Sequence, residues 1–232
     1  MELIDSSVDP IMNPTLFIGS FELREPLTTL TDVAVAFVCF YAYIKFLKYK
    51  GEKSEGFKFF KIFFLVFGIG LMCAALFGHG LLAYFDPNTK AIGWALNSFA
   101  QILLGLGVLK EMEPVMKPSM INSVRIFFIL QVFLFVFLII NPFTRNFIYV
   151  QLCSVISLVA LVLPLQIFHY TKTKAKASKF FIISILMGLL PAVVFNFKLG
   201  FGVWFNHNDI SHIIMVFMMY FMYLGASRFA FL

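Results

Sequence analysis

Residues 205–224 read FNHNDISHIIMVFMMYFMYL, and this stretch joins a polar cluster directly to a long apolar run. Five strongly polar side chains lie within the seven positions from Asn206 to His212, and the apolar run continues to Leu224. A polar cluster at the start of a membrane span is costly unless it is paired, hydrated or bound to a ligand. What these side chains meet in the folded protein is therefore the central question about function.

The composition of the whole chain is that of a membrane protein. Hydrophobic residues make up 61% of the sequence, charged residues 13%, and the mean hydropathy is +0.92. Soluble domains average about 45–50% apolar and about 25% charged residues. The apolar excess falls into blocks of about 17–25 residues, which is the length that crosses a bilayer. We predict an all-α, polytopic protein with a polar segment at 1–25 and a seven-helix transmembrane domain at 26–232. The expected spans are 26–49, 59–84, 91–110, 124–140, 147–170, 180–197 and 209–224.

Basic residues predict the orientation of this bundle. The loops after the first, third and fifth spans, with the C-terminal tail, contain 14 of the 18 Lys and Arg residues. Because cytoplasmic loops are enriched in Lys and Arg, we expect the N-terminus outside and the C-terminus inside. The same pattern explains the net charge of +6 without a nucleic-acid partner. Membrane lipid is the expected surrounding, and the sequence leaves both the oligomeric state and the particular membrane open.

Prolines and cysteines add smaller constraints. Pro26 suits the first turn of a helix, and Pro164 predicts a bend within the fifth span. Cys39, Cys73 and Cys153 all lie in apolar runs, so we expect neither a disulfide framework nor a thiolate metal site. The first residues are acidic and lack an early apolar stretch, so we expect no cleavable signal peptide.

Polar side chains from four spans are predicted to lie at one depth. At a rise of about 1.5 Å per residue, Asp32 and Asn97 lie roughly 9 Å from the outer ends of their spans. His79 lies near the outer end of span 59–84, and the last span begins on that side with its polar cluster. We therefore expect a shared site beneath the outer surface, which also includes Gln101, one helical turn beyond Asn97.

Imidazoles and carboxylates at one depth favour a zinc site, in which three protein ligands leave one position open. We predict that His79 and His212 bind zinc together with His207 or Asp209. His207 and His212 are about 140° apart on an ideal helix, so His207 can join only if the helix begins after it or is locally overwound.

Plainer interpretations of the same residues stay open. The group could be a buried hydrogen-bond network without a metal. Asp209 and His207 could simply cap the last helix, and Asn97 could join helices by hydrogen bonds. His169, at the inner end of the fifth span, is typical of an interfacial anchor.

Two short stretches resemble the CREST superfamily of seven-helix membrane hydrolases, which includes alkaline ceramidases and adiponectin/progestin-type receptors. They are Phe77-Gly78-His79-Gly80, late in the second span, and Asp209-Ile210-Ser211-His212, which opens the seventh. The resemblance implies an N-outside topology and a zinc ion held by three histidines where the second span ends. The resemblance in topology extends over the whole chain, whereas the resemblance in sequence motif is confined to these two stretches.

The chain departs from the pattern of that family at three places. Ala75 stands where the family has a serine, and Asn208 stands where it has the first histidine of the last span. The family's acid near the start of the third span has no clear counterpart here. The resemblance therefore implies a divergent member, in which Asp32 or Asp209 takes the role of that acid.

The function expected from these residues is zinc-dependent hydrolysis of a lipid-like amide or ester at the outer leaflet. Asp32 or Asp209 is the expected proton acceptor, and Asn97 is the expected donor to the oxyanion. The alternative is a ligand-binding or sensor protein whose polar pocket performs no chemistry. Transport is less favoured, because polar residues thin out beyond Gln101 and no inverted repeat is seen. A retinal protein is excluded by the absence of lysine from the last span.

Overall fold

A computed structural model of the protein describes residues 14–51 and 54–229. As predicted, seven helical segments are long and apolar enough to cross a membrane. The acidic residues before position 14 and Lys53 lie outside the described residues. The first four spans are α1 (Pro26–Lys48), α2 (Glu55–Cys73) with its continuation η1 (Ala74–Gly80), the short η2 (Pro87–Thr89) leading into α3 (Lys90–Met112), and α4 (Pro118–Ile140). The last three are α5 (Phe147–Ser154) continued by η3 (Val155–Val162) and α6 (Leu163–Thr173), then α7 (Lys176–Asn196) and α8 (His207–Phe229).

Several helices begin earlier than the hydropathy pattern predicted. The helix α4 begins at Pro118 instead of residue 124, because proline is well suited to the first turn of a helix. The segment η3, which ends just before Pro164, is π-helical. Proline lacks an N–H and clashes with the carbonyl four residues earlier. The irregularity expected at Pro164 is therefore a π-helical stretch within a continuous span.

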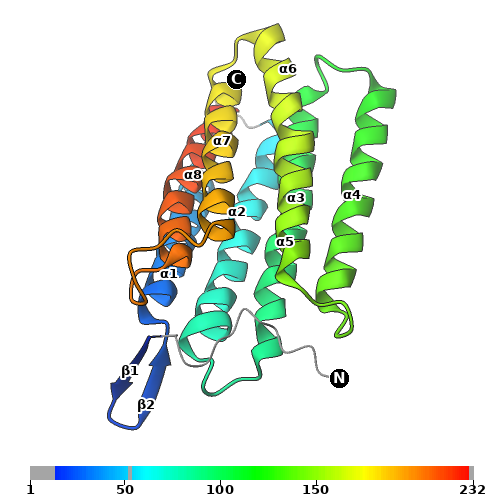
Figure 1. Cartoon of the computed structure of the whole chain (residues 1–232). Coiled ribbons are helices and arrows are strands. Elements are labelled where there is room, and N and C mark those ends of the chain that lie inside the picture. Colours follow the sequence, from blue (N-terminus) through cyan, green and yellow to red (C-terminus); the bar gives the residue numbers. More distant parts are fainter. Residues whose placement is uncertain (1–13, 52–53, 230–232) are drawn as a thin grey trace.

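The helices pack so that segments far apart in the sequence become neighbours (Figure 1). The helix α1 packs against both α2 and α8, α7 packs against α8, and α3 lies between α2 and α4. One half of the core is strongly aromatic, with Phe60 packed against both Phe181 and Phe229. This order places α1, η1 and α8 around one end of the bundle.

The helices α2 and α3 approach each other through glycines. A Cβ atom added to Gly93 would lie 2.8 Å from the carbonyl oxygen of Gly70 and 2.9 Å from the backbone nitrogen of Ala74. Small residues permit such close backbone contact between membrane helices. This contact sets the position of η1, since η1 is the direct continuation of α2.

A β-hairpin that the sequence analysis did not predict precedes α1. Strand β1 (Thr15–Ile18) pairs antiparallel with β2 (Phe21–Arg24), and Gly19 adopts a left-handed backbone with φ of 63° in the turn. The hairpin rests on the segment after η1, where Phe21 stacks on Tyr84 and the Glu22 N–H donates to the Tyr84 hydroxyl at 2.7 Å. Residues 15–24, which the sequence analysis assigned only to a polar segment, therefore form a regular hairpin.

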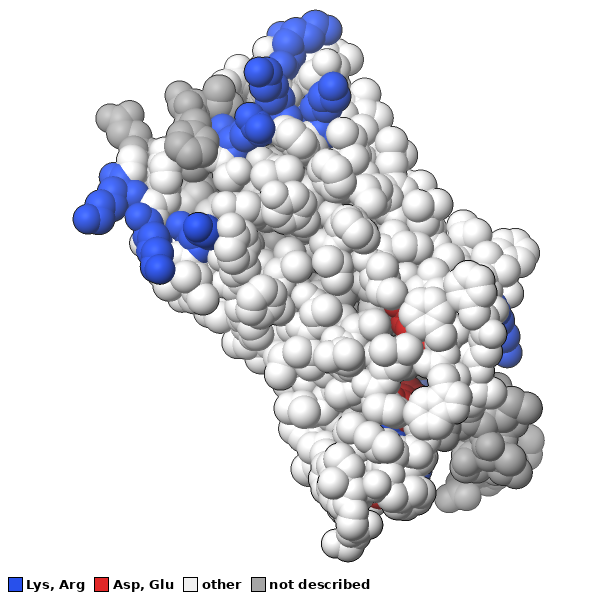
Figure 2. All heavy atoms as spheres, turned by 90° about the vertical axis from the view of Figure 1, so that its left-hand side faces the viewer, with Lys and Arg blue, Asp and Glu red and all other residues white. Residues whose placement is uncertain are grey.

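The two ends of the bundle differ in charge. Figure 2 shows that, on the face drawn, Lys and Arg gather mainly at the end opposite the hairpin. This is the end formed by the loops after α1, α3 and α6, as the basic residues of the sequence require. The direction in which the bundle crosses the membrane stays a prediction from the charge pattern.

We expect Gly93→Ala to destabilise the protein strongly, because its new methyl group would meet backbone atoms that cannot rotate away. Overpacking of this kind typically costs about 1–3 kcal/mol. Thermal unfolding in detergent should therefore occur at a clearly lower temperature. Gly78→Ala is the matched control, since its Cβ would meet only side-chain atoms at 3.7 and 4.0 Å. Equal melting temperatures for the two variants would contradict the close approach of α2 and α3.

Candidate functional site

Three helices bring one carboxylate and two imidazoles together near the hairpin end of the bundle. His212 on α8 places Nε2 3.3 Å from Oδ1 of Asp32 on α1. His79 on η1 places Nε2 3.7 Å from Oδ2 of the same carboxylate. The Asp32 side chain is only 3% exposed, whereas the His79 and His212 side chains are 22% and 15% exposed. A buried acid thus lies beneath two partly accessible imidazoles, and these are three of the residues predicted from the sequence.

Glu25 joins this group, although the sequence analysis missed it. Its Oε2 accepts a hydrogen bond from Nδ1 of His79. Its backbone has φ of 43°, in the left-handed region that non-glycine residues rarely adopt. Residues that precede proline prefer an extended backbone, and Glu25 departs from this preference. Its N–H donates to the Pro14 carbonyl at 2.7 Å, which helps to hold the backbone in this conformation. Strained backbone of this kind is common at functional sites. The only sequence signal was an acid directly before the proline that begins α1.

The contacts of Thr31 favour one tautomer of His212. The Thr31 hydroxyl donates to the Thr28 carbonyl at 3.0 Å, and its oxygen lies 3.1 Å from Nδ1 of His212. A hydroxyl has a single hydrogen to donate. With that hydrogen on the Thr28 carbonyl, the Thr31 oxygen accepts from Nδ1–H of His212. In neutral His212 this leaves the lone pair on Nε2, which faces Asp32.

The contact with Glu25 favours the corresponding tautomer of His79. An ionised carboxylate only accepts hydrogen bonds, so Nδ1–H of His79 donates to Glu25 and the lone pair lies on Nε2. Both neutral imidazoles then present lone pairs to the Asp32 carboxylate, which is itself an acceptor. Within the described part of the chain, Oδ2 of Asp32 is buried and has no hydrogen-bond donor. Such an arrangement is repulsive unless a positive charge, either a proton or a metal ion, lies among the three groups.

The donor set matches the chemistry of a zinc site. Ligand atoms about 2.1 Å from a tetrahedral ion lie about 3.4 Å from each other. The nitrogen–oxygen distances here are 3.3 Å to Oδ1 and 3.7 Å to Oδ2 of the same carboxylate. Metal-binding histidines usually donate their other N–H to a protein acceptor, which Glu25 and Thr31 supply. No group of three or more His, Cys, Asp or Glu side chains in the described ranges forms a preformed metal site. The ring centroids of His79 and His212 are 6.2 Å apart, so the rings must move closer to share an ion.

Asp209 helps to cap α8, which is one of the two roles that the sequence left open for it. The Asn206 N–H donates to its Oδ2 at 2.7 Å, and the Thr28 hydroxyl donates to its Oδ1 at 2.7 Å. Asn206 in turn accepts from the Asn208 N–H at 2.8 Å. Asn206 is thus the capping residue of α8, and Asp209 is the acid that completes the capping box three positions later. Because both oxygens are engaged, Asp209 joins α8 to α1 and holds His212 opposite Asp32.

The structure does not bring His207 or Asn97 into the group. The His207 ring packs against the Phe195 ring, with centroids 5.2 Å apart. Asn97 lies against Gly70 of α2, nine residues before His79 and therefore about 13 Å further along the helix. Gln101 lies one turn deeper still. Hydropathy placed these residues at one approximate depth, but it could not show which neighbour each side chain faces.

His169 belongs to the opposite end of the bundle. It is buried there, and its Nδ1 is 2.7 Å from the Ser178 hydroxyl of α7. It therefore joins two helices instead of standing at the interface as an exposed anchor.

One family model matches nearly all of the transmembrane domain. It describes a family of unknown function, DUF6962, and it covers residues 27–230. This chain belongs to that family. No curated protein and no solved structure matches the chain. The match to DUF6962 includes Asp32, His79 and His212, and it begins two residues after Glu25. The resemblance to CREST hydrolases stays a prediction.

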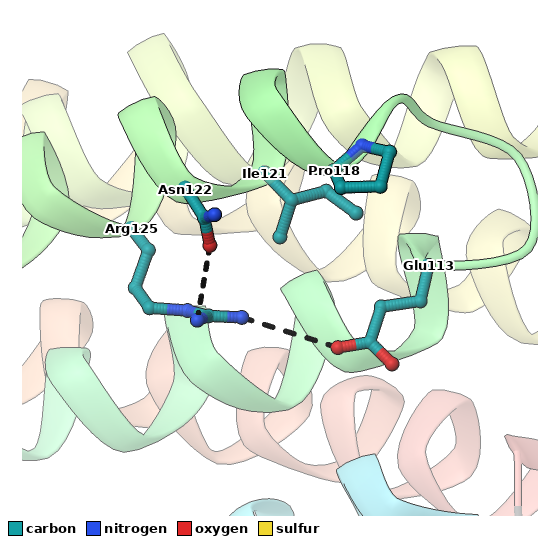
Figure 3. A pocket seen from close by; sticks show the side chains of 5 residues that line it. All are labelled: Glu113, Pro118, Ile121, Asn122 and Arg125. Carbon is teal, nitrogen blue, oxygen red and sulfur yellow. Dashed lines mark hydrogen bonds and ion pairs between the residues drawn. The ribbon is translucent and has the colours of Figure 1, made fainter.

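A hollow at the basic end of this DUF6962 protein is a weaker candidate for a functional site. It is a cavity of about 230 Å³ between the end of α3 and the first turns of α4 (Figure 3). Arg125 there donates to Asn122 at 3.2 Å and lies 3.9 Å from the Glu113 carboxylate. Since these polar groups satisfy one another, the contacts brace the connection between α3 and α4.

We expect Thr28→Val to destabilise the protein by about 1–3 kcal/mol, because it leaves a buried Asp209 oxygen without its donor. Thermal or denaturant unfolding in detergent will measure the loss. Thr29→Val is the control, since the Thr29 hydroxyl makes only a 3.5 Å contact with the Arg24 carbonyl. A Thr28→Val protein as stable as the control would show that the link between α1 and α8 contributes little.

Proposed function

We propose that this protein is a metal-dependent membrane hydrolase in which His79, His212 and Asp32 hold zinc and act on a lipid-like amide or ester. The observation that carries the proposal is the convergence of two imidazole nitrogens on one buried carboxylate, with Nε2 of His212 3.3 Å from Oδ1 of Asp32 and Nε2 of His79 3.7 Å from Oδ2. A divalent cation can bind both imidazole nitrogens and the carboxylate at once. A single proton can lie in only one of the two nitrogen–oxygen contacts.

The residues of the chain have separable roles in this proposal. Glu25 and Thr31 hold Nδ1–H of the two imidazoles, so that each Nε2 keeps its lone pair towards Asp32. When bound, zinc supplies the Lewis acidity that makes water a nucleophile near neutral pH. If Oδ1 of Asp32 were the ligand atom, Oδ2, which has no hydrogen-bond donor in the described structure, would be the group that takes the proton of the attacking water and returns it to the leaving group.

A lipid-like substrate is supported by the surroundings of the group. It lies near the end of three apolar spans, and apolar side chains next to it face outward, among them Leu30 on α1 and Ile213 on α8. A soluble polar substrate would have to pass such a surface. The charge pattern of the loops predicts that this end lies in the outer leaflet.

The proposal modifies the ligand set expected from the CREST resemblance. That resemblance implies three histidines, but His207 lies against Phe195, outside the group. Asp32 supplies the third donor instead, and two histidines with one carboxylate are a known zinc ligand set. Asn97 is too deep to reach the same reacting group, so the proposal assigns it no catalytic role.

Metal analysis of the purified protein tests the proposal. After dialysis against metal-free buffer, we expect about one zinc ion per wild-type chain. His79→Ala, His212→Ala and Asp32→Ala should each retain less than about a tenth of that content. The same proteins are then assayed with a fluorescent ceramide and a fluorescent carboxylic ester, whose cleavage should be lost with the metal.

His207→Ala and His169→Ala are the matched controls, because both remove an imidazole from outside the group. Each should keep the wild-type metal content. A wild-type protein without any metal after supplementation with zinc would disprove the metal site. The group would then be a proton-bearing network in a ligand-binding protein. Stoichiometric zinc without cleavage of either lipid would keep the site and disprove the hydrolase.

We expect Glu25→Gln to lower zinc affinity about 10–100-fold, because a carboxylate that accepts from a metal-binding histidine raises its basicity. Competition with a chelator of known affinity will measure the change. Glu22→Gln is the control, since Glu22 pairs with Arg24 in the hairpin at 2.7 Å and does not touch His79. Equal affinities in both variants would mean that Glu25 only packs against the imidazole.

A further inference from the structure

We infer that the hairpin β1–β2 and the connection between α7 and α8 are immersed in the lipid headgroup region of the surrounding bilayer. The two segments are separate in sequence. The hairpin extends beyond the start of α1, and the connection loops outward beside the first turns of α8 (Figure 1). The occupant of their apolar surfaces is phospholipid of that leaflet. This inference concerns the surface of the protein and does not depend on the metal chemistry.

The hairpin exposes large apolar side chains where a soluble hairpin would be polar. Phe17 is 68% exposed and Ile18 is 61% exposed, and Leu16 and Phe21 are also exposed. Two-stranded hairpins of this size are marginally stable in water. Contact with a lipid interface removes these side chains from water and so stabilises the hairpin.

The connection between α7 and α8 has the same character. Phe201 is 86% exposed and Trp204 is 57% exposed, with Leu199 and Val203 beside them. The connection is folded, since Phe201 stacks on Phe205 and its N–H donates to the Phe205 carbonyl at 2.9 Å. Tryptophan is enriched at the membrane–water interface because its ring is amphipathic.

The distribution of this apolar surface favours lipid over a protein partner. Exposed aromatic residues occur on the hairpin and on three connections at this end, including Tyr84 before α3 and Phe143 between α4 and α5, which is 93% exposed. A protein partner would cover one contiguous patch, whereas a bilayer interface surrounds the bundle. The surface is also continuous with the lipid-facing sides of the helices, where Leu30 and Phe37 are exposed.

The backbone limits how deep these segments can lie. A two-stranded sheet leaves N–H and carbonyl groups unpaired along both outer edges. Such groups are not tolerated in the hydrocarbon region, where water cannot bond to them. The segments therefore belong at headgroup depth, with side chains directed towards the acyl chains.

This placement puts two lipid contacts beside the site. The hairpin packs against η1, which carries His79, and the α7–α8 connection leads directly into α8, which carries His212. A lipid that approaches the imidazoles from the bilayer would pass between two surfaces that are already in contact with lipid.

Tryptophan fluorescence in proteoliposomes tests the inference. The sequence contains only Trp94 and Trp204, so Trp94→Phe leaves Trp204 as a single reporter of the connection. Phe17→Trp in a Trp94→Phe/Trp204→Phe background reports on the hairpin. The vesicles are phosphatidylcholine with bromine on the acyl chains, either close to the headgroup or close to the bilayer centre.

We expect the bromine close to the headgroup to quench both reporters at least twice as strongly as the central bromine, with weak quenching by acrylamide from water. Leu130→Trp in the tryptophan-free background is the control, because Leu130 is 63% exposed near the middle of α4 and should show the reverse order. Strong acrylamide quenching without bromine quenching would overturn the inference, and so would stronger quenching by the central bromine. Circular dichroism and size-exclusion profiles confirm that each variant is folded, and the result does not depend on metal binding or lipid cleavage.

Discussion

The arrangement of this protein depends on one buried carboxylate. A charged aspartate within a membrane helix costs about 2.5–3.5 kcal/mol even on the mildest scale, and Asp32 has a side chain that is only 3% exposed. Two imidazoles from other helices face it, yet their own hydrogen bonds point their lone pairs at it. A positive charge among the three groups would offset this repulsion, which is the physical basis of the proposed cation site.

Much of the surrounding structure holds that group in place. Asp209 joins the start of α8 to Thr28 of α1, which positions His212. The glycine contact between α2 and α3 positions η1, and Glu25 fixes the ring of His79 from the opposite side. These supports come from segments separated by up to 181 residues. A loss at any of them would displace one of the three side chains without removing it, so residues outside the group control its geometry.

The hairpin end of the molecule combines a charged interior with an apolar rim. Charged and polar side chains converge inside α1, η1 and α8, while aromatic side chains occupy the connections around them. A membrane interface accommodates both, because headgroups and water are available to the site and acyl chains to the rim. The opposite end, with its lysines and arginines, has the composition of a surface in contact with water and anionic headgroups.

The sequence by itself determined the class of fold, because seven apolar blocks separated by charged loops leave a chain few alternatives in a bilayer. It also indicated that Asp32, His79 and His212 share a depth, since helix rise converts residue number into height. Rise does not determine the rotation of one helix against another. Only the tertiary structure therefore separated these three residues from His207, Asp209 and Asn97. Glu25 and the hairpin escaped prediction because their roles arise from backbone contacts between segments, which no hydropathy pattern records.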